Sequence, residues 1–262
     1  MEVNILEEED DRLKFVLEGV DPEFANAVRR TAIAKVPTMA VKEVDFINNT
    51  SGLFDEILAH RIGMVPWKFD REHYNIPEDC DCEDDGCHNC QVTLALKKEG
   101  EGDVRASDFK PTDKDVETTN PDILLAKLLE DQEVELEAKA VLGIGKDHAK
   151  FQAANASYRY YPIVRVNGKE VENREEAVKL APEEVKNADG AIEADNDIVY
   201  AMEDAVDIEE GDEIEIEQRD DKFIFEIESV SGLEPREILV RAVDIVSDEV
   251  DEFESIAKQS LE

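Results

Sequence analysis

All four cysteines of this 262-residue chain lie in one short acidic segment, CDCEDDGCHNC. They are Cys80, Cys82, Cys87 and Cys90, with the spacing C-x-C-x4-C-x2-C. Four thiolates on one loop can surround a tetrahedral zinc ion at about 2.3 Å per bond, which leaves no ligand position open for a reaction. An iron–sulfur cluster at the same cysteines is the alternative. The short C-x-C spacing and the acidic setting favour a structural ion.

Charge and composition limit the class of protein. The chain has 29 Lys and Arg against 67 Asp and Glu, a net charge of −38. Such a surface predicts little or no direct nucleic-acid contact, because that contact depends on basic groups. The acidic residues are spread along the whole chain, which favours adaptation to a salt-rich cytoplasm over mimicry of a nucleic acid or attraction to a basic partner.

The location expected from the sequence also bears on the cysteines. The chain has no apolar run long enough to cross a membrane and no apolar signal segment at its N-terminus, so we expect a cytoplasmic protein without membrane contact. In a reducing compartment, clustered thiols are more often metal ligands than disulfides. The sequence therefore predicts a metal loop.

Helical and strand-like segments are mixed along the chain without a regular βαβ repeat, so the predicted fold class is α+β. Alternating apolar residues predict strands at 12–20, 39–47, 91–100, 133–143, 156–166 and 221–230. Helical periodicity and capping residues predict helices at 21–37, 55–63, 121–132 and 235–258. Segment 170–220 is strongly acidic and predicts a small separate module.

The first and last of these helices carry apolar stripes. Asp21 suits the N-cap and Pro22 the first helical position of the first helix. Its stripe consists of Phe24, Ala27, Val28, Thr31 and Ala32. Arg29 and Arg30 lie outside this stripe. The last helix would be about 36 Å long, more than a small domain needs for its own core, so it implies a partner. Its stripe consists of Leu239, Ala242, Val246, Val250, Phe253 and Ala257.

Other candidate residues favour a structural interpretation. Gly143 and Gly145 lack the third glycine of a dinucleotide fingerprint, so we expect a turn. No nucleophile or paired carboxylate accompanies His148 and Lys150, and His60 stands alone in a short helix. The sequence therefore predicts no catalytic residues.

Two long segments and the end of the chain resemble a known family. The segments are FVLEGVDPEFANAVRRTAIAKVPTMAVKEVDFINNTS, followed by FDEILAHRIGMVPWKFD, and the later AVLGIGKDHAKFQAANASYRYYPIV. Together with the last strand and helix, they resemble the D subunit of archaeal DNA-directed RNA polymerase, a relative of bacterial alpha and of the third-largest subunit of eukaryotic RNA polymerase II. The resemblance covers essentially the whole chain, with residues 166–220 the poorest match.

The resemblance implies a domain organisation. A discontinuous dimerisation domain would comprise residues 1–45 and 221–262, and a β-rich insertion domain, 46–165, would carry the cysteine loop with a structural zinc. Residues 166–220 would form a small ferredoxin-like module. That segment contains no cysteine, so it cannot hold the iron–sulfur cluster that some relatives carry there.

The implied function is assembly of a nucleotidyltransferase complex whose catalytic residues lie on other subunits. The chain would pair with subunit L and form the platform for the small subunits N and P and the large catalytic subunits. Arg29 and Arg30 match the family's double arginine and would meet the second-largest subunit. The predicted partner interface comprises Phe24, Val28, Arg29, Arg30, Thr31, Leu239, Val246, Val250 and Phe253.

The competing hypotheses are a free-standing redox metalloprotein and a DNA mimic.

Overall fold

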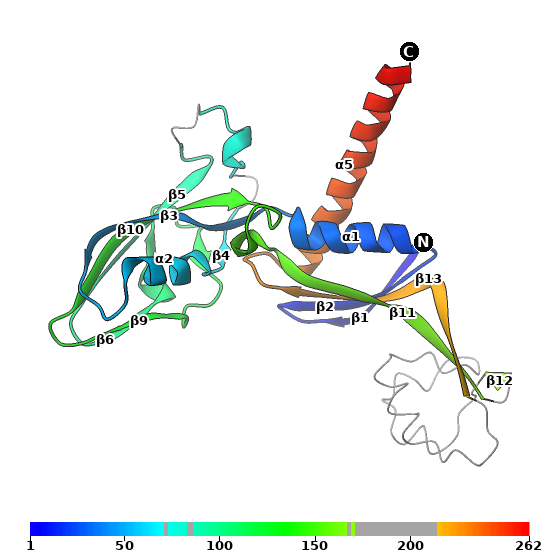
Figure 1. The fold of residues 1–262 in the computed structure, drawn as a ribbon, viewed down its shortest axis with the longest axis horizontal. Helices are drawn as coiled ribbons and strands as arrows, with labels where there is room; N and C mark the ends of the chain where they lie inside the picture. The colour runs from blue at the N-terminus through cyan, green and yellow to red at the C-terminus, as the bar shows by residue number, and fades with distance from the viewer. Residues whose placement is uncertain (71–72, 83–85, 167–168, 171–213, 262) are drawn as a thin grey trace. The chain divides into compact units, whose positions relative to one another are not determined.

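The computed structural model describes residues 1–70, 73–82, 86–166, 169–170 and 214–261 (Figure 1). Its helices are α1 (Pro22–Ala34), α2 (Asp55–Gly63) and α5 (Pro235–Leu261). The longer strands are β1 (Glu2–Glu8), β2 (Arg12–Glu18), β3 (Thr38–Asn49), β5 (Gln91–Glu99), β6 (Gly102–Arg105), β9 (Leu124–Leu128), β10 (Glu133–Gly143), β11 (Ala154–Val166) and β13 (Ile214–Ser229). The two-residue strands are β4 (Trp67–Lys68), β7 (Lys110–Pro111), β8 (Glu117–Thr118) and β12 (Lys169–Glu170).

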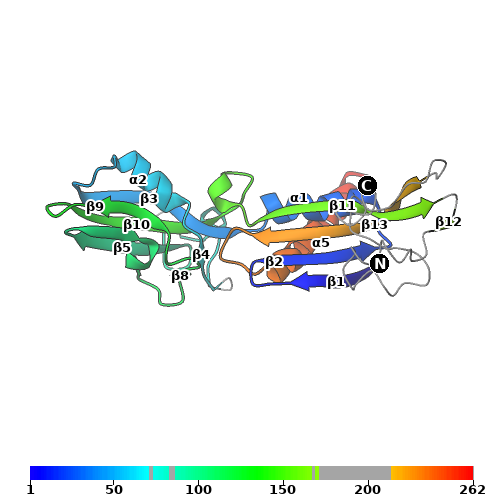
Figure 2. The ribbon, with the colours of Figure 1, turned by 90° about the horizontal axis from the view of Figure 1, so that it is seen from below.

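Two larger sheets organise the described residues. The five-stranded sheet has the order β1-β2-β13-β11-β12, so it joins strands from distant parts of the sequence (Figure 2). The four-stranded sheet has the order β3-β10-β5-β7 and is built from consecutive sequence, while β4-β8 and β6-β9 form small ribbons. The mixture of helices and sheets confirms the predicted α+β class.

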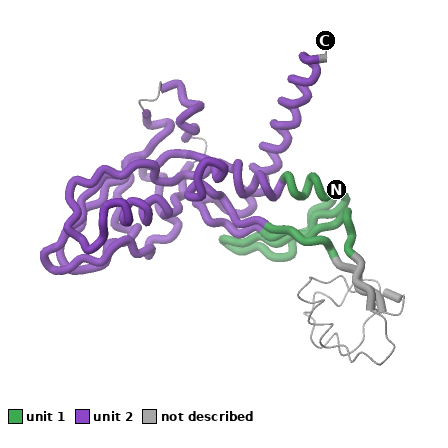
Figure 3. Tube along the Cα trace, in the orientation of Figure 1, with its two compact units in different colours: residues 1–27, 157–226 green, residues 28–156, 227–262 purple. Residues whose placement is uncertain are grey.

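The chain divides into two compact units, coloured separately in Figure 3. Unit 1 comprises Met1–Ala27 and Ser157–Glu226, and unit 2 comprises Val28–Ala156 and Ile227–Glu262. Both units are assembled from two separate stretches of sequence.

Aromatic side chains from different strands form the core of unit 1. Phe15 of β2 stacks on Phe225 of β13, with ring centroids 5.2 Å apart and planes 11° from parallel. Tyr158 of β11 lies 5.3 Å from the Phe223 ring and 5.2 Å from the Phe225 ring. Because side chains alternate along a strand, these aromatic residues share one face of the sheet. Val16, Tyr161 and Ile224 form a smaller buried cluster on the alternate residues.

The four-stranded sheet β3-β10-β5-β7, which we call the insertion sheet, carries the large core of unit 2. Strand β10 lies between β3 and β5 and pairs antiparallel with both. Helix α2 contributes Leu58 and Ile62 to this core, which also buries Trp67 against Phe109 in an edge-to-face contact. The site described below is attached to this rigid sheet through strand β5.

Two glycines allow close approach of backbones in unit 2. A Cβ on Gly145 would lie 2.5 Å from the Ile33 carbonyl oxygen at the end of α1. The turn at Gly145 is held there by the Lys146 N–H, which donates to the Ala34 carbonyl over 2.8 Å. This confirms the predicted turn at Gly145 and explains its glycine, whereas Gly143 is the last residue of β10. A Cβ on Gly232, just before α5, would lie 1.8 Å from the Trp67 carbonyl oxygen.

Most predicted elements within the described residues are confirmed, with one error, and the strands β1 and β6 and the two-residue strands were not predicted. The segment 121–132 was predicted to be a helix, but it contains strand β9, which pairs antiparallel with β6. Its apolar run is short enough to fit either structure, and pairing with β6 decides between them. The N-terminal strand β1 was not predicted, because its apolar residues are embedded in acidic ones.

Most of the predicted acidic module lies outside the described residues. Its last residues, from Ile214 onward, form the beginning of β13. Among the helices in the described part of the chain, none is long and apolar enough to cross a membrane.

Candidate functional site

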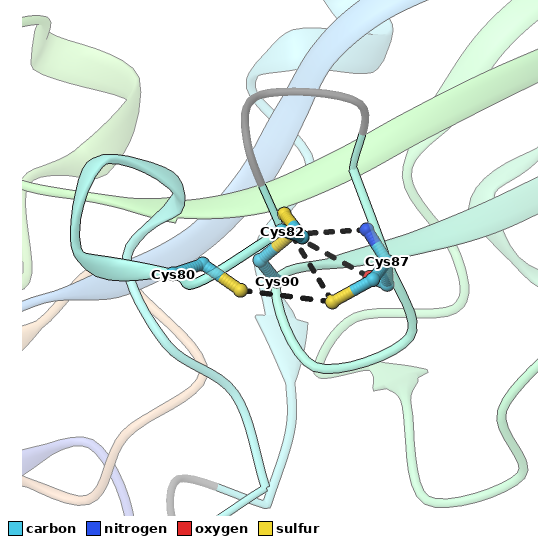
Figure 4. Close-up of side chains that lie close together, drawn as sticks. All are labelled: Cys80, Cys82, Cys87 and Cys90. Carbon is cyan, nitrogen blue, oxygen red and sulfur yellow. Dashed lines mark hydrogen bonds between the residues drawn. The ribbon is translucent and has the colours of Figure 1, made fainter.

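The four cysteine sulfurs converge at one point of unit 2 (Figure 4). The Sγ atoms of Cys80 and Cys87 are 3.6 Å apart, as are those of Cys82 and Cys90, and Cys87 and Cys90 are 3.9 Å apart. All four Sγ atoms lie within 4.8 Å of one another. Cys90 is buried and the other three are partly buried. Within the described residues, this is the one group of Cys, His, Asp or Glu side chains that could hold a metal ion.

Short-range hydrogen bonds shape the loop that presents these sulfurs. A 3₁₀ turn at Pro77–Asp79 precedes the first cysteine, and the Cys80 N–H donates to the Pro77 carbonyl over 3.2 Å. The Cys87 carbonyl accepts the N–H groups of Cys90 and Gln91, at 3.1 and 3.0 Å. Strand β5 begins at Gln91, so the last cysteine is fixed directly to the insertion sheet.

Gly86 allows the chain to turn into the second cysteine pair. Its φ is +74°, in the left-handed region that glycine adopts without strain. A Cβ there would also lie 2.4 Å from the Gln91 side-chain oxygen. Glycine at this position therefore serves both the turn and the packing of the loop.

Backbone N–H groups point at two of the sulfurs. The Cys87 N–H donates to the Cys90 Sγ over 3.2 Å, and the Asn89 N–H donates to the Cys87 Sγ over 3.4 Å. The bond from Asn89 lowers the pKa of the Cys87 thiol. Burial raises the pKa of Cys90, and a hydrogen bond with Cys82 raises the pKa of Cys80 to about 12. Thiols held this closely become ligands when a cation replaces their protons.

The sulfur positions fit a single tetrahedral ion. With bonds of about 2.3 Å, the ligands of tetrahedral zinc lie about 3.8 Å apart. Three of the six sulfur–sulfur separations, at 3.6, 3.6 and 3.9 Å, are close to that value, and all six are within 4.8 Å. In an iron–sulfur cluster the four cysteines bind different iron atoms, which would spread the sulfurs further apart.

Helix α1 places the predicted partner residues in different environments. Val28 and Thr31 are only 2% and 3% exposed, so they are packed inside the chain. Phe24 is half-buried and Arg30 is exposed. Arg29 is half-buried and takes part in an interaction within the chain.

Two faces of helix α5 carry apolar residues. Its inner face consists of Ile238, Arg241 and Ala242, which are all buried. A second row recurs at alternating spacings of four and three residues and faces about 100° away from the first, at 3.6 residues per turn. We call this row the outer seam: Leu239, Val243, Val246, Val250, Phe253 and Ala257.

Exposure varies along the outer seam and is greatest at Val250 and Phe253. Leu239 and Val246 are half-buried, whereas Val250 is 60% and Phe253 73% exposed. The predicted stripe included Ala242 and omitted Val243, and the structure corrects both, because Ala242 lies on the inner face. The four-and-three spacing of Val243 was visible in the sequence.

The remaining candidate residues are parts of the scaffold. The Lys150 N–H donates to His148 Nδ1 over 3.0 Å, and Lys150 Nζ donates to the Val41 carbonyl over 2.9 Å. These contacts fasten the turn after β10 to strand β3. His60 is exposed on α2.

Comparison with known proteins defines the class of this protein. Residues 44–163 match the family described as the RNA polymerase Rpb3/RpoA insert domain. That span contains α2, the cysteine loop and the insertion sheet except for residues 38–43 of β3.

Curated relatives extend the match over nearly the whole chain. The DNA-directed RNA polymerase subunit Rpo3 of Methanosphaera stadtmanae is 36% identical, covering 96% of this chain and 96% of its own. The Rpo3 subunits of Pyrococcus furiosus and Halobacterium salinarum are 38% and 35% identical over 97% of this chain, covering 95% and 96% of their own. The chain belongs to the Rpo3 family of DNA-directed RNA polymerase subunits, which confirms the family expected from the sequence.

Proposed function

We propose that this chain is a non-catalytic assembly subunit that pairs with subunit L and forms the platform for subunits N and P and the large catalytic subunits of RNA polymerase. Catalysis would depend on residues of those other subunits. The observation that carries this proposal is the outer seam of α5, which exposes Val250 and Phe253 to solvent. A row of large apolar residues in a heptad spacing is typical of a helix that packs against another helix.

The area available on α5 is compatible with a stable pair. The helix has 27 residues and would be about 40 Å long. A specific interface buries about 800 Å² per partner, and permanent interfaces bury more. The half-buried Phe24 of α1 and the outer seam are the residues that we propose to contribute to it.

Co-purification tests the proposal. The full chain, expressed with an affinity tag in a cell that contains the other polymerase subunits, should retain subunit L at molar salt, because apolar contacts withstand salt. A tagged chain with Val250→Asp and Phe253→Asp should lose subunit L. Recovery of subunit L in equal amounts by both chains would contradict the proposed surface.

We further propose that the cysteine site holds a structural zinc ion. The support is the match between the sulfur separations and the edge of a single-ion tetrahedron. Zinc would close the loop that leads into β5 and supply no reaction. Elemental analysis of the full chain should give one equivalent of zinc and a colourless protein, while visible absorption from iron and sulfide would contradict the assignment.

The double arginine on α1 belongs to the same proposal. Exposed Arg30 is free to meet the second-largest subunit, whereas Arg29 is already engaged within the chain. We therefore expect Arg30→Ala to reduce capture of the second-largest subunit more than Arg29→Ala does. Equal capture by both variants and the unaltered chain would remove this role.

The domain boundaries and the salt adaptation are proposals as well. Residues 1–45 and 221–262 would form the dimerisation domain, 46–165 the insertion domain and 166–220 the small acidic module. The even distribution of 67 acidic residues supports function in a salt-rich cytoplasm. Unfolding midpoints that rise steeply between low and molar salt would agree with that proposal, and a flat profile would not.

A further inference from the structure

A cavity lies between the cysteine loop and the insertion sheet. Its volume is about 360 Å³, and its lining includes the cysteines Cys82 and Cys90 together with Glu78 of the loop. From the sheet, Lys42 and Glu43 of β3 and Lys139 of β10 line the same cavity. Two thiol ligands and two ammonium groups therefore border one space.

The ionic partners of these two lysines differ. Lys139 Nζ lies 3.3 Å from a Glu43 carboxylate oxygen on the neighbouring strand. Lys42 has no carboxylate partner among the described residues, although the chain contains 67 acidic side chains and only 29 basic ones. Among the described residues, Lys42 therefore needs a negative group other than a paired carboxylate, and for Lys139 the exposed Glu43 supplies only part of the offsetting charge.

The cysteine site supplies that negative charge. Four thiolates around a divalent ion leave a net charge of −2, and the adjacent Glu78, Asp79 and Asp81 are acidic as well. Bringing four thiolates together in this acidic setting is unfavourable unless cations lie close by. Among the described residues that line the cavity, Lys42 and Lys139 are the only cations.

We propose that Lys42 and Lys139 are positioning residues of the metal site, whose positive charges stabilise the four thiolates across the cavity. They do not touch the ion, and they act through the charge of its ligands. The inference rests on the proposed metal site and adds to it a dependence on two residues outside the loop, contributed by β3 and β10. Outer partners of metal ligands commonly change metal affinity by about 10- to 100-fold.

Cobalt binding to the full chain tests the inference, because thiolate-bound Co²⁺ absorbs visible light. The variants are Lys42→Met, Lys139→Met and the double variant, titrated with Co²⁺ in competition with a chelator. We expect about threefold to fivefold weaker binding for each single variant and about tenfold or more for the double one, the low end of the range for outer partners. Lys42→Arg keeps the charge and should keep the affinity.

Lys97→Met is the matched control. Lys97 is on β5 of the same sheet, pairs with Glu135 at 2.8 Å and does not line the cavity. It removes the same charge from the chain, so its Co²⁺ affinity should remain unchanged. The loss in the cavity variants should also shrink between 0.1 and 1 M salt, where the screening length falls from about 10 to 3 Å.

The outcomes separate the two proposals. If the unaltered chain binds one equivalent of Co²⁺ and the Lys42 and Lys139 variants match the Lys97 control, the role of the lysines is overturned while the metal site stands. If the unaltered chain binds no Co²⁺ at its cysteines, the metal site fails and this inference fails with it. Circular dichroism confirms for each variant that the metal-free chain keeps its secondary structure.

Discussion

Two faces of α5 carry apolar residues but have different surroundings. The inner face, with Ile238, Arg241 and Ala242, is buried by the chain's own residues. The outer seam presents Val250 and Phe253 to solvent on the same helix. The chain's own residues therefore cover one face and leave Val250 and Phe253 of the other exposed.

Helical periodicity alone does not separate these two situations. An apolar stripe shows that a helix face is buried in the working protein, and it carries no information on which chain buries it. On α1, the same kind of stripe includes Val28 and Thr31, which are buried within the chain. Burial in the folded chain separates the stripe residues that contribute to its stability from those that are exposed and available for association.

The sharpest test of this contrast places a charge on each face of α5. Ala242→Asp should destabilise the chain by about 3–5 kcal/mol, because it buries a carboxylate without a partner. Val250→Asp, at an exposed position, should change stability by less than about 0.5 kcal/mol. Denaturant unfolding of the two purified variants measures the difference, and equal losses would show that the faces do not differ.

The second test concerns the residue that leads into α5. Gly232→Ala would bring a methyl group within 1.8 Å of the Trp67 carbonyl oxygen, so the backbone must shift. We expect a loss of about 2–3 kcal/mol, in the range for overpacked sites. Gly52→Ala is the control, since nothing lies within 4 Å of its added methyl group. A similar stability for both variants would mean that the start of α5 is loosely held.

The third test asks whether the outer seam acts in association and not in folding. Phe253→Ala should leave the unfolding midpoint of the isolated chain unchanged, because the ring is 73% exposed. It should weaken binding of subunit L by about 2 kcal/mol, or about thirtyfold, the effect of a central apolar anchor. Titration calorimetry with purified subunit L measures the change. Loss of stability without loss of binding would reverse the assignment.

The smallest expected effect concerns the ion pair between Lys35, which follows α1, and Glu249 of α5. Both side chains are 38–49% exposed, so the pair should contribute less than about 1 kcal/mol. A double-mutant cycle with Lys35→Met and Glu249→Gln gives the coupling energy. A coupling above about 2 kcal/mol would mean that the pair, and not the inner face, fixes the helix.

The sequence predicted elements best where local signals agree. Asp21 and Pro22 mark the start of α1, and Pro235 marks the start of α5, as the structure has them. Alternation predicted β10 at its observed bounds, Glu133–Gly143. In these segments capping, turn chemistry and periodicity all favour the same structure.

Prediction failed where long-range pairing decides the structure. Strand β9 forms because Leu128 and Leu124 pair with Gly102 and Arg105 of β6, and this pairing cannot be read from the apolar run itself. Strand β1 pairs with β2 along its length although its side chains are almost all exposed, so it has no alternation of burial to detect.

The cysteine cluster was predictable and its surroundings were not. The C-x-C-x4-C-x2-C spacing predicted that the four cysteines lie together, because they are near one another in sequence. Lys42 and Lys139 are about 40 and 50 residues from the loop in sequence, and sheet pairing brings them to the same cavity. Because a lysine on a strand belongs to no recognisable motif, the sequence did not predict their place.

The strand order β1-β2-β13 limits the order in which parts of the newly made chain can fold. Strand β2 ends at Glu18 and its neighbour β13 begins at Ile214, so about 200 residues, or some 10–40 s of translation, separate them. The strands of the insertion sheet all lie between Thr38 and Gly143, so this sheet can form during translation. The N-terminal hairpin of β1 and β2 pairs with β13 only after that interval.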